Sequence, residues 1–207
     1  MRTKLRVLLA AVAVAGMAFA VGGMASFVLP ALAQKAAVDT AKRLQKARET
    51  TITLSERLRT ELAAAIKNGG VVGAMGLCQT VSPDLVTNAA DEFGFEAGRT
   101  ALRLRNPENA PDEWEQKVLL QFQAQMGAGH DVSKLEFSEI VTTAEGDRLF
   151  RYMKPIMTGE MCLSCHGTDI KPDVKAEITR YYPEDKATGF KLGELRGAFS
   201  LVQLIEE

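Results

Sequence analysis

The stretch that decides the fold is residues 135–158, LEFSEIVTTAEGDRLFRYMKPIMT. Residues 135–143 and 148–158 are rich in β-branched and aromatic side chains, which favour strands. The four residues between them, AEGD at 144–147, have the composition of a turn. Two strands this close in the sequence pair antiparallel, so we predict a β-hairpin.

Two helices are predicted on the N-terminal side of this hairpin. Residues 35–67 contain no glycine or proline, and their apolar side chains fall near helical spacing. Asn68-Gly69-Gly70 then ends this long helix, because glycine is the usual residue after a C-cap. A second helix is expected over residues 112–126, with Asp112 and Glu115 placed as a capping box. We interpret the long helix as a packing helix, the alternative being a signalling or dimerising helix.

Two further strands complete the expected sheet. Residues 94–105 are predicted to form a strand with one basic face. The odd positions from 99 to 105 are arginine or alanine, whereas Leu102 and Leu104 lie on the other face. Residues 106–111 hold two prolines and two asparagines and are expected to turn. Residues 197–204 form the final predicted strand. Strands and helices do not alternate as βαβ units, so we predict an α+β fold with an antiparallel sheet.

The N-terminus has the pattern of an export signal. Three basic residues within the first six positions precede an apolar run at 7–29, and Ala-Leu-Ala follows at 31–33. The run is also long enough to cross a bilayer, so without cleavage residues 7–29 would anchor the protein in the membrane. Either outcome places residue 35 onward outside the cytoplasm. We expect a periplasmic protein.

Composition excludes one class of partner. The chain has 25 basic and 26 acidic residues, and no stretch forms a basic stripe. We therefore expect no nucleic-acid partner.

The residues with the most specific chemistry are Cys162-Leu163-Ser164-Cys165-His166, the C-x-x-C-H pattern of c-type haem attachment. Two thiols at this spacing add to the two haem vinyl groups, and the adjacent imidazole reaches the iron. We predict one covalent haem c held by Cys162 and Cys165, with His166 as metal ligand. A thioredoxin-like motif would need a βαβ setting, a zinc site would need four ligands, and a plain disulfide would leave His166 unexplained.

The second axial ligand has several candidates. Cys78 would be a leftover thiol in an oxidising compartment, although its apolar surroundings also suit a buried, inert cysteine. His130 lies between glycines and aspartate in a loop and is more simply an exposed histidine. The methionines near the motif are better explained as core residues or lie too close to Cys162: Met153, Met157 and Met161.

Arginines and aromatic residues are candidates for the rest of a haem pocket. Haem propionates are anionic and pair well with guanidinium groups, so Arg99, Arg103 and Arg105 are candidate cofactor-binding residues. A solvated strand face is the alternative for each of them. Three aromatic side chains are expected to line the pocket or to pack in an ordinary core: Phe150, Tyr152 and Phe199.

Four segments together resemble a family of secreted bacterial monohaem proteins: RLRNPENAPDEWE at 103–115, CLSCHG at 162–167, YPEDKATG at 182–189 and GELRGA at 193–198. Members of that family carry a c-type haem in a PAS-like domain, and most have no characterised function. The resemblance spans about residues 35–207. It implies a PAS-like antiparallel sheet with flanking helices, and a His/Cys axial pair in which Cys78 is the second ligand.

These observations divide the chain into residues 1–33, a signal peptide or uncleaved anchor, residues 34–70, the N-terminal helix, and residues 71–207, a PAS-like haem domain. We expect electron transfer with an unknown redox partner protein. A haem-based redox or gas sensor acting through a partner is the alternative. An enzyme such as a peroxidase needs an open distal site with acid–base residues. A filled second axial position argues against such a site, so we do not expect an enzyme.

Overall fold

The computed structural model describes residues 31–76 and 92–206 of the chain, so Cys78 and the predicted leader segment 1–30 lie outside the described residues. The elements run in the order α1 (Ala31–Gly73), β1 (Glu96–Thr100), a 3-10 turn (Pro107–Asn109), α3 (Glu113–Gly127), a second 3-10 turn (Val132–Lys134), β2 (Phe137–Thr142), β3 (Arg148–Met157), α4 (Glu160–His166), α5 (Pro172–Tyr181) and β4 (Leu195–Leu204).

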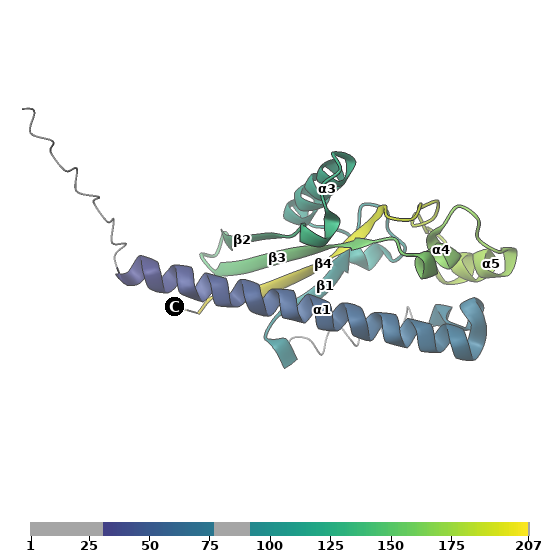
Figure 1. Ribbon diagram of the computed structural model, residues 1–207, viewed down its shortest axis with the longest axis horizontal. Helices are drawn as coiled ribbons and strands as arrows, with labels where there is room; N and C mark the ends of the chain where they lie inside the picture. Colours follow the sequence, from purple (N-terminus) through teal and green to yellow (C-terminus); the bar gives the residue numbers. More distant parts are fainter. Residues whose placement is uncertain (1–30, 77–91, 207) are drawn as a thin grey trace, which may run out of the picture.

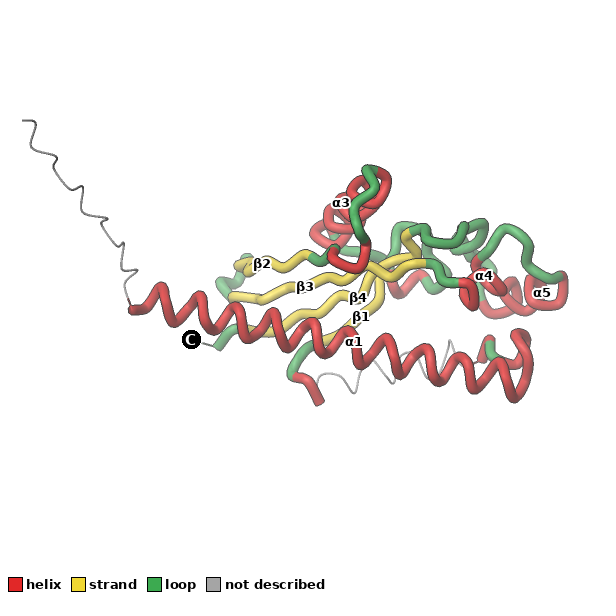
Figure 2. The backbone as a smooth tube through the Cα atoms, viewed as in Figure 1, coloured by secondary structure: helices red, strands yellow, loops and turns green. Residues whose placement is uncertain are grey.

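The four strands form one antiparallel sheet in the order β1-β4-β3-β2 (Figure 2). The predicted hairpin is confirmed, with Phe137 opposite Met153 and Thr142 opposite Arg148. The predicted last strand is present as β4, which lies in the middle of the sheet between β1 and β3. The structure therefore confirms the α+β class with an antiparallel sheet and flanking helices. Whether the sheet is PAS-like stays a prediction.

Helices cover both faces of this sheet. Neighbouring side chains on β3 point to opposite faces: Tyr152 packs with Ala47 and Leu54 of α1, whereas Met153 packs with the apolar side of α3. Phe150 and Phe199 share the α1 cluster, so all three aromatic candidates for the pocket wall are core residues there. Figure 1 shows α1 running past the sheet to the end where α4 and α5 lie.

The long N-terminal helix is confirmed and slightly longer than predicted. Its helical geometry breaks at Gly70, whose φ is 67° and ψ −178°. A positive φ is strained for residues other than glycine, so the helix breaks at one of the glycines that we predicted to end it. A short helical segment follows Gly70. Arg48 binds Glu136, which also accepts a hydrogen bond from Tyr152 Oη at 3.0 Å. Among the described residues, no helix combines the length and apolarity needed to cross a membrane.

The helix and turn predicted between residues 106 and 126 are also confirmed. Asp112 caps α3 and accepts a bond of 2.7 Å from the Glu115 backbone N–H, while the Glu115 carboxylate accepts from the Asp112 N–H at 3.0 Å. This reciprocal pair is the predicted capping box. Asn106 begins the 3-10 turn inside the proline-rich segment.

The strand predicted over residues 94–105 is wrong beyond Thr100. Pairing with β4 ends at the Thr100–Ala198 pair, and the next residue of β4, Gly197, lies so close to β1 that an added Cβ would be 2.4 Å from the Thr100 carbonyl oxygen. The chain then bonds to a different segment: the Leu104 carbonyl accepts from the Lys186 N–H at 2.8 Å. Residues 101–105 therefore form a loop, and the alternating basic face does not exist as a strand surface.

Candidate functional site

Helix α4 brings the two cysteines and the histidine of the motif together. It begins directly after Gly159, close to the end of β3, and His166 is its last residue. Cys162 and Cys165 are one helical turn apart and so share a side of α4. The Cys162 sulfur lies beside Gly159, since a Cβ there would be 3.8 Å from it. In the part of the chain that the structure describes, no disulfide joins these two cysteines.

The His166 ring is held in one tautomer by a backbone carbonyl. Its Nδ1 lies 2.6 Å from the Ala187 oxygen. A carbonyl only accepts, so Nδ1 carries the hydrogen and donates it, and Nε2 keeps its lone pair. Histidines that bind a metal through one ring nitrogen commonly donate the hydrogen of the other to a carbonyl or carboxylate, as Nδ1 does here. The Phe190 ring packs edge-on against the imidazole at 6.3 Å between centroids and further fixes its orientation.

The surroundings keep His166 neutral. Burial lowers its pKa most, and the positive charges of Arg196, Arg105 and Arg99 lower it further, to about 2. The hydrogen bond to Ala187 acts in the opposite direction but is outweighed. A neutral imidazole with an unprotonated nitrogen is the form that coordinates a metal.

A loop packed against the end of α4 supplies this carbonyl. The Phe190 N–H donates to the His166 carbonyl at 2.9 Å, and the Gly189 N–H donates to the Gly167 carbonyl at 2.8 Å. Gly167 itself is required by close packing, because a Cβ there would be 2.5 Å from the Leu163 carbonyl oxygen. The helix end and the loop are therefore one rigid unit.

A buried ion pair fixes the loop. Arg105 Nε and Nη2 donate to the two carboxylate oxygens of Asp185 at 3.2 and 3.1 Å, and both side chains are less than a tenth exposed. Arg105 Nη2 also donates to the Cys165 carbonyl at 2.6 Å, while Asp185 accepts from the Ala187 N–H at 2.9 Å. Arg105 is thus committed to protein contacts, and its role in this structure is to position α4 and the partner of His166.

The other two predicted arginines differ in setting. Arg103 is exposed, lies over the Phe190 ring with its guanidinium carbon 4.1 Å from the centroid, and donates to the Lys186 carbonyl at 3.2 Å. Arg99 lies on β1 opposite Phe199, close enough for its charge to act on His166. Their predicted role at propionates stays a prediction.

Arg196 is the site residue that sequence reasoning missed. Ile156 pairs with Gly197 and Met157 with Leu195, so Arg196 is the extra residue of a β-bulge in β4. Bulges redirect a side chain away from the regular alternation. Burial and repulsion from Arg105 and Arg99 lower the pKa of Arg196 to about 10. An arginine directly before a strand glycine, in GELRGA, was the signal available in the sequence.

The candidates for a second axial ligand are dispersed. Cys78 lies outside the described residues. His130 is exposed after α3, Met153 is buried in the sheet core, and Met157 is 44% exposed. One sulfur that the sequence did not single out lies beside the motif: Met75 is buried with Val174, Ile178 and Tyr182, and its Sδ is 3.9 Å from the Cys165 sulfur. Met161 is partly buried beside the motif.

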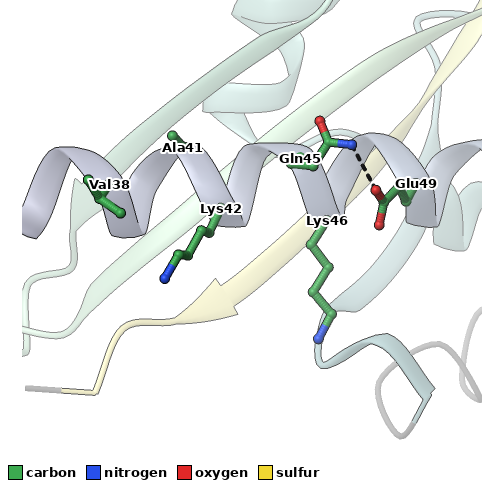
Figure 3. Close-up of a pocket in the computed structure, with 6 residues that line it drawn as sticks. All are labelled: Val38, Ala41, Lys42, Gln45, Lys46 and Glu49. Carbon is green, nitrogen blue, oxygen red and sulfur yellow. Dashed lines mark hydrogen bonds between the residues drawn. The ribbon is translucent and has the colours of Figure 1, made fainter.

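Two of the hollows on the surface of the described residues bear on where the site lies. One, of about 310 Å³, lies beside α4 and is lined by Leu163, Gly167, Thr168, Asp169, Phe190, Lys191 and Leu192. The other runs along α1 and is lined by Val38, Ala41, Lys42, Gln45, Lys46 and Glu49 (Figure 3). The second is formed by a single helix, and its one hydrogen bond, from Gln45 to Glu49, is an ordinary pair within that helix. Of these two hollows, the one beside α4 adjoins the cysteine–histidine motif.

Comparison with known proteins gives one family and one fold. The family described as Tll0287-like matches residues 31–203. The solved structure titled "Crystal structure of the cyanobacterial heme-protein Tll0287" is 24% identical and superposes with a TM-score of 0.53. The match covers 78% of this chain and 97% of that one. No match is found among curated proteins. At this identity the solved structure supports the fold.

Proposed function

The chain belongs to the Tll0287-like family, and from that premise we propose that it binds one covalent haem c and transfers electrons in the periplasm. Cys162 and Cys165 form the thioether bonds and His166 binds the iron through Nε2. The observation that carries this proposal is the bond from His166 Nδ1 to the Ala187 carbonyl, which leaves Nε2 available on the helix that holds both thiols. The related cyanobacterial protein is titled a heme-protein, which agrees with it.

The residues present fit a haem by their chemistry. Two thiols one turn apart precede a neutral imidazole, the donor set of a c-type site. The guanidinium groups of Arg196 and Arg99 act electrostatically on that imidazole, which suits a cofactor with anionic carboxylates. Arg196 Nε is buried and has no hydrogen-bond partner within residues 31–76 and 92–206, so the site has a donor for a further acceptor.

A bound haem supplies a one-electron iron couple. The protein's own residues tune it: the Ala187 carbonyl fixes the ring of His166, and Arg105 with Asp185 fixes Ala187. Cys78 remains our proposed second ligand. A thiolate there would favour ferric iron and a low potential. With both axial positions filled, electron transfer is favoured over catalysis at the iron. We place residues 1–33 as the export signal or anchor.

Covalent haem attachment is the direct test. The full chain, produced with a c-type haem maturation system, should retain haem through acid–acetone extraction and give the pyridine haemochrome spectrum of two thioether bonds. The Cys162→Ser, Cys165→Ser double variant should lose the haem. Ser164→Ala, an exposed change between the two cysteines, is the matched control and should keep it. Haem that extracts freely from the wild-type protein would contradict the proposal.

A redox or gas sensor is the second candidate, and one contact favours it. Met75 follows the long helix α1, which packs against both β3 and α5, and its sulfur lies 3.9 Å from the sulfur of Cys165. A change in ligation at the iron would therefore reach α1. Carbon monoxide titration of the reduced protein separates the two functions. A sensor binds the gas with loss of the Cys78 bond, whereas an electron carrier keeps both ligands in both oxidation states.

A further inference from the structure

The guanidinium group of Arg196 is unusual in having few partners. Nη1 makes a long bond of 3.4 Å to the Arg103 carbonyl, and the Phe190 ring lies 5.5 Å from its central carbon. Nε is buried with no hydrogen-bond partner among the residues that the structure describes. A buried donor without an acceptor costs about 1–3 kcal/mol, and more when it is charged. Such a group calls for an acceptor that is not among the described residues.

No carboxylate of the described chain is available to supply that acceptor. None of the ion pairs within the described ranges includes Arg196. Asp185 is the acidic residue whose charge stabilises Arg196, yet both of its oxygens are bonded by Arg105. The positive charges of Arg105 and Arg99 add repulsion. The local balance is therefore an excess of positive charge beside His166.

The backbone holds Arg196 at this point. The β-bulge makes Leu195 and Ala198 both face α3, where they share one apolar cluster, although they are three positions apart. In a regular strand, residues three apart face opposite sides. The bulge therefore releases Arg196 from the alternation. Gly197 allows β1 to pass close by, because any side chain there would meet the Thr100 carbonyl. Arg196 and the adjacent Gly197 together therefore set the position of the guanidinium group.

We infer that Arg196 binds a propionate carboxylate of the haem, and that it, rather than Arg105 or Arg103, is the principal anion-binding residue of the site. This inference rests on the proposed haem function. Arg196 lies within electrostatic range of His166 and Cys162, the cofactor's attachment points. A carboxylate would satisfy the buried Nε and neutralise the excess charge in one contact. Arg105 positions the loop, and Arg103 lies exposed over Phe190.

The test compares haem-loaded full-length variants. Arg196→Gln removes the charge but keeps a polar side chain, and Arg196→Lys keeps the charge without the forked geometry. Arg148→Gln removes the same charge from an exposed position at the start of β3. It lies about 30 Å along that strand from the end nearest α4, at 3.3 Å per residue. Two readouts report on the propionate: the haem reduction potential and the propionate bending bands in the resonance Raman spectrum.

Arg196→Gln should lower the potential, because an uncompensated propionate stabilises ferric iron, and should shift the propionate bands. Arg196→Lys should give a smaller shift in the same direction, and Arg148→Gln should match the wild type. Equal potentials and spectra in all four haem-loaded proteins would overturn the inference while leaving the haem function intact. If Arg196→Gln does not fold, unshifted propionate bands in Arg196→Lys overturn it in the same way. Wild-type protein without covalent haem would refute both.

Discussion

Replacing Asp185 by asparagine probes the support of His166 without touching His166 itself. The change keeps the shape of the side chain but removes the charge that faces buried Arg105. Breaking one partner of a buried pair costs about 3–5 kcal/mol, because the remaining charge is left uncompensated. The asparagine oxygen still accepts from Arg105 or from the Ala187 N–H, and Arg105 keeps the Cys165 carbonyl. We therefore expect a loss of about 3 kcal/mol, the lower end of that range.

Urea unfolding of the haem-loaded protein measures this loss. With a typical urea dependence of about 2 kcal/mol per molar, the midpoint should fall by about 1.5 M. Adding Arg105→Gln to Asp185→Asn should restore part of the loss, since no uncompensated charge then remains. Glu177→Gln, which breaks the exposed pair with Arg180 on α5, is the control and should leave the midpoint unchanged. A loss for Asp185→Asn as small as that of the control would refute the assignment of a buried, positioning ion pair.

Three other changes test the packing of the fold. Gly197→Ala should destabilise the protein by about 1–3 kcal/mol, because the new Cβ meets a β1 carbonyl. Gly69→Ala, which has open space around it, is the control and should not destabilise the protein. Thermal melts of the two variants measure the difference. Phe122→Ala should cost about 3–5 kcal/mol in urea unfolding, since this fully buried ring fills the α3 side of the sheet, and a cost below 1 kcal/mol would contradict that. The hydrogen bond from Arg48 lowers the pKa of Glu136 in the folded protein. The pair therefore contributes its full stability above the unfolded pKa of about 4.3, and this stability is lost as the pH falls through the lower folded pKa. Stability measured against pH should show this decline in the wild type and a weaker one in Glu136→Gln.

Elements whose determinants are close in the sequence were predictable. The hairpin depends on two strand segments and the four-residue turn between them, and the break at Gly70 depends on one residue's backbone. The capping box of α3 needs only Asp112 and Glu115. The spacing of Cys162, Cys165 and His166 is equally local, although we predicted no helix over these residues. In each case the contacts form within a few positions of the chain, so residue type and spacing suffice.

Contacts between distant segments were not predictable in this way. The pattern of residues 94–105 alternates like a strand, yet pairing with β4 stops at Thr100, and Leu104 bonds to residue 186 instead. Alternation reports which side chains share a face, but not where a partner strand stops pairing. For the same reason Arg105, predicted on the basic face of that strand as a candidate partner of a haem propionate, is instead buried against Asp185, 80 positions away.

The sequence by itself determined the chemistry of the candidate site, since two thiols and an imidazole at C-x-x-C-H spacing lie within five residues of one helix. Only the tertiary structure decided how that chemistry is held. The tautomer of His166 depends on the carbonyl of Ala187, and the position of the Arg196 side chain depends on a bulge between β3 and β4. Both depend on which backbone atoms meet across the fold. Backbone carbonyls are the same in every residue, so no residue type in the sequence marks the one that will accept.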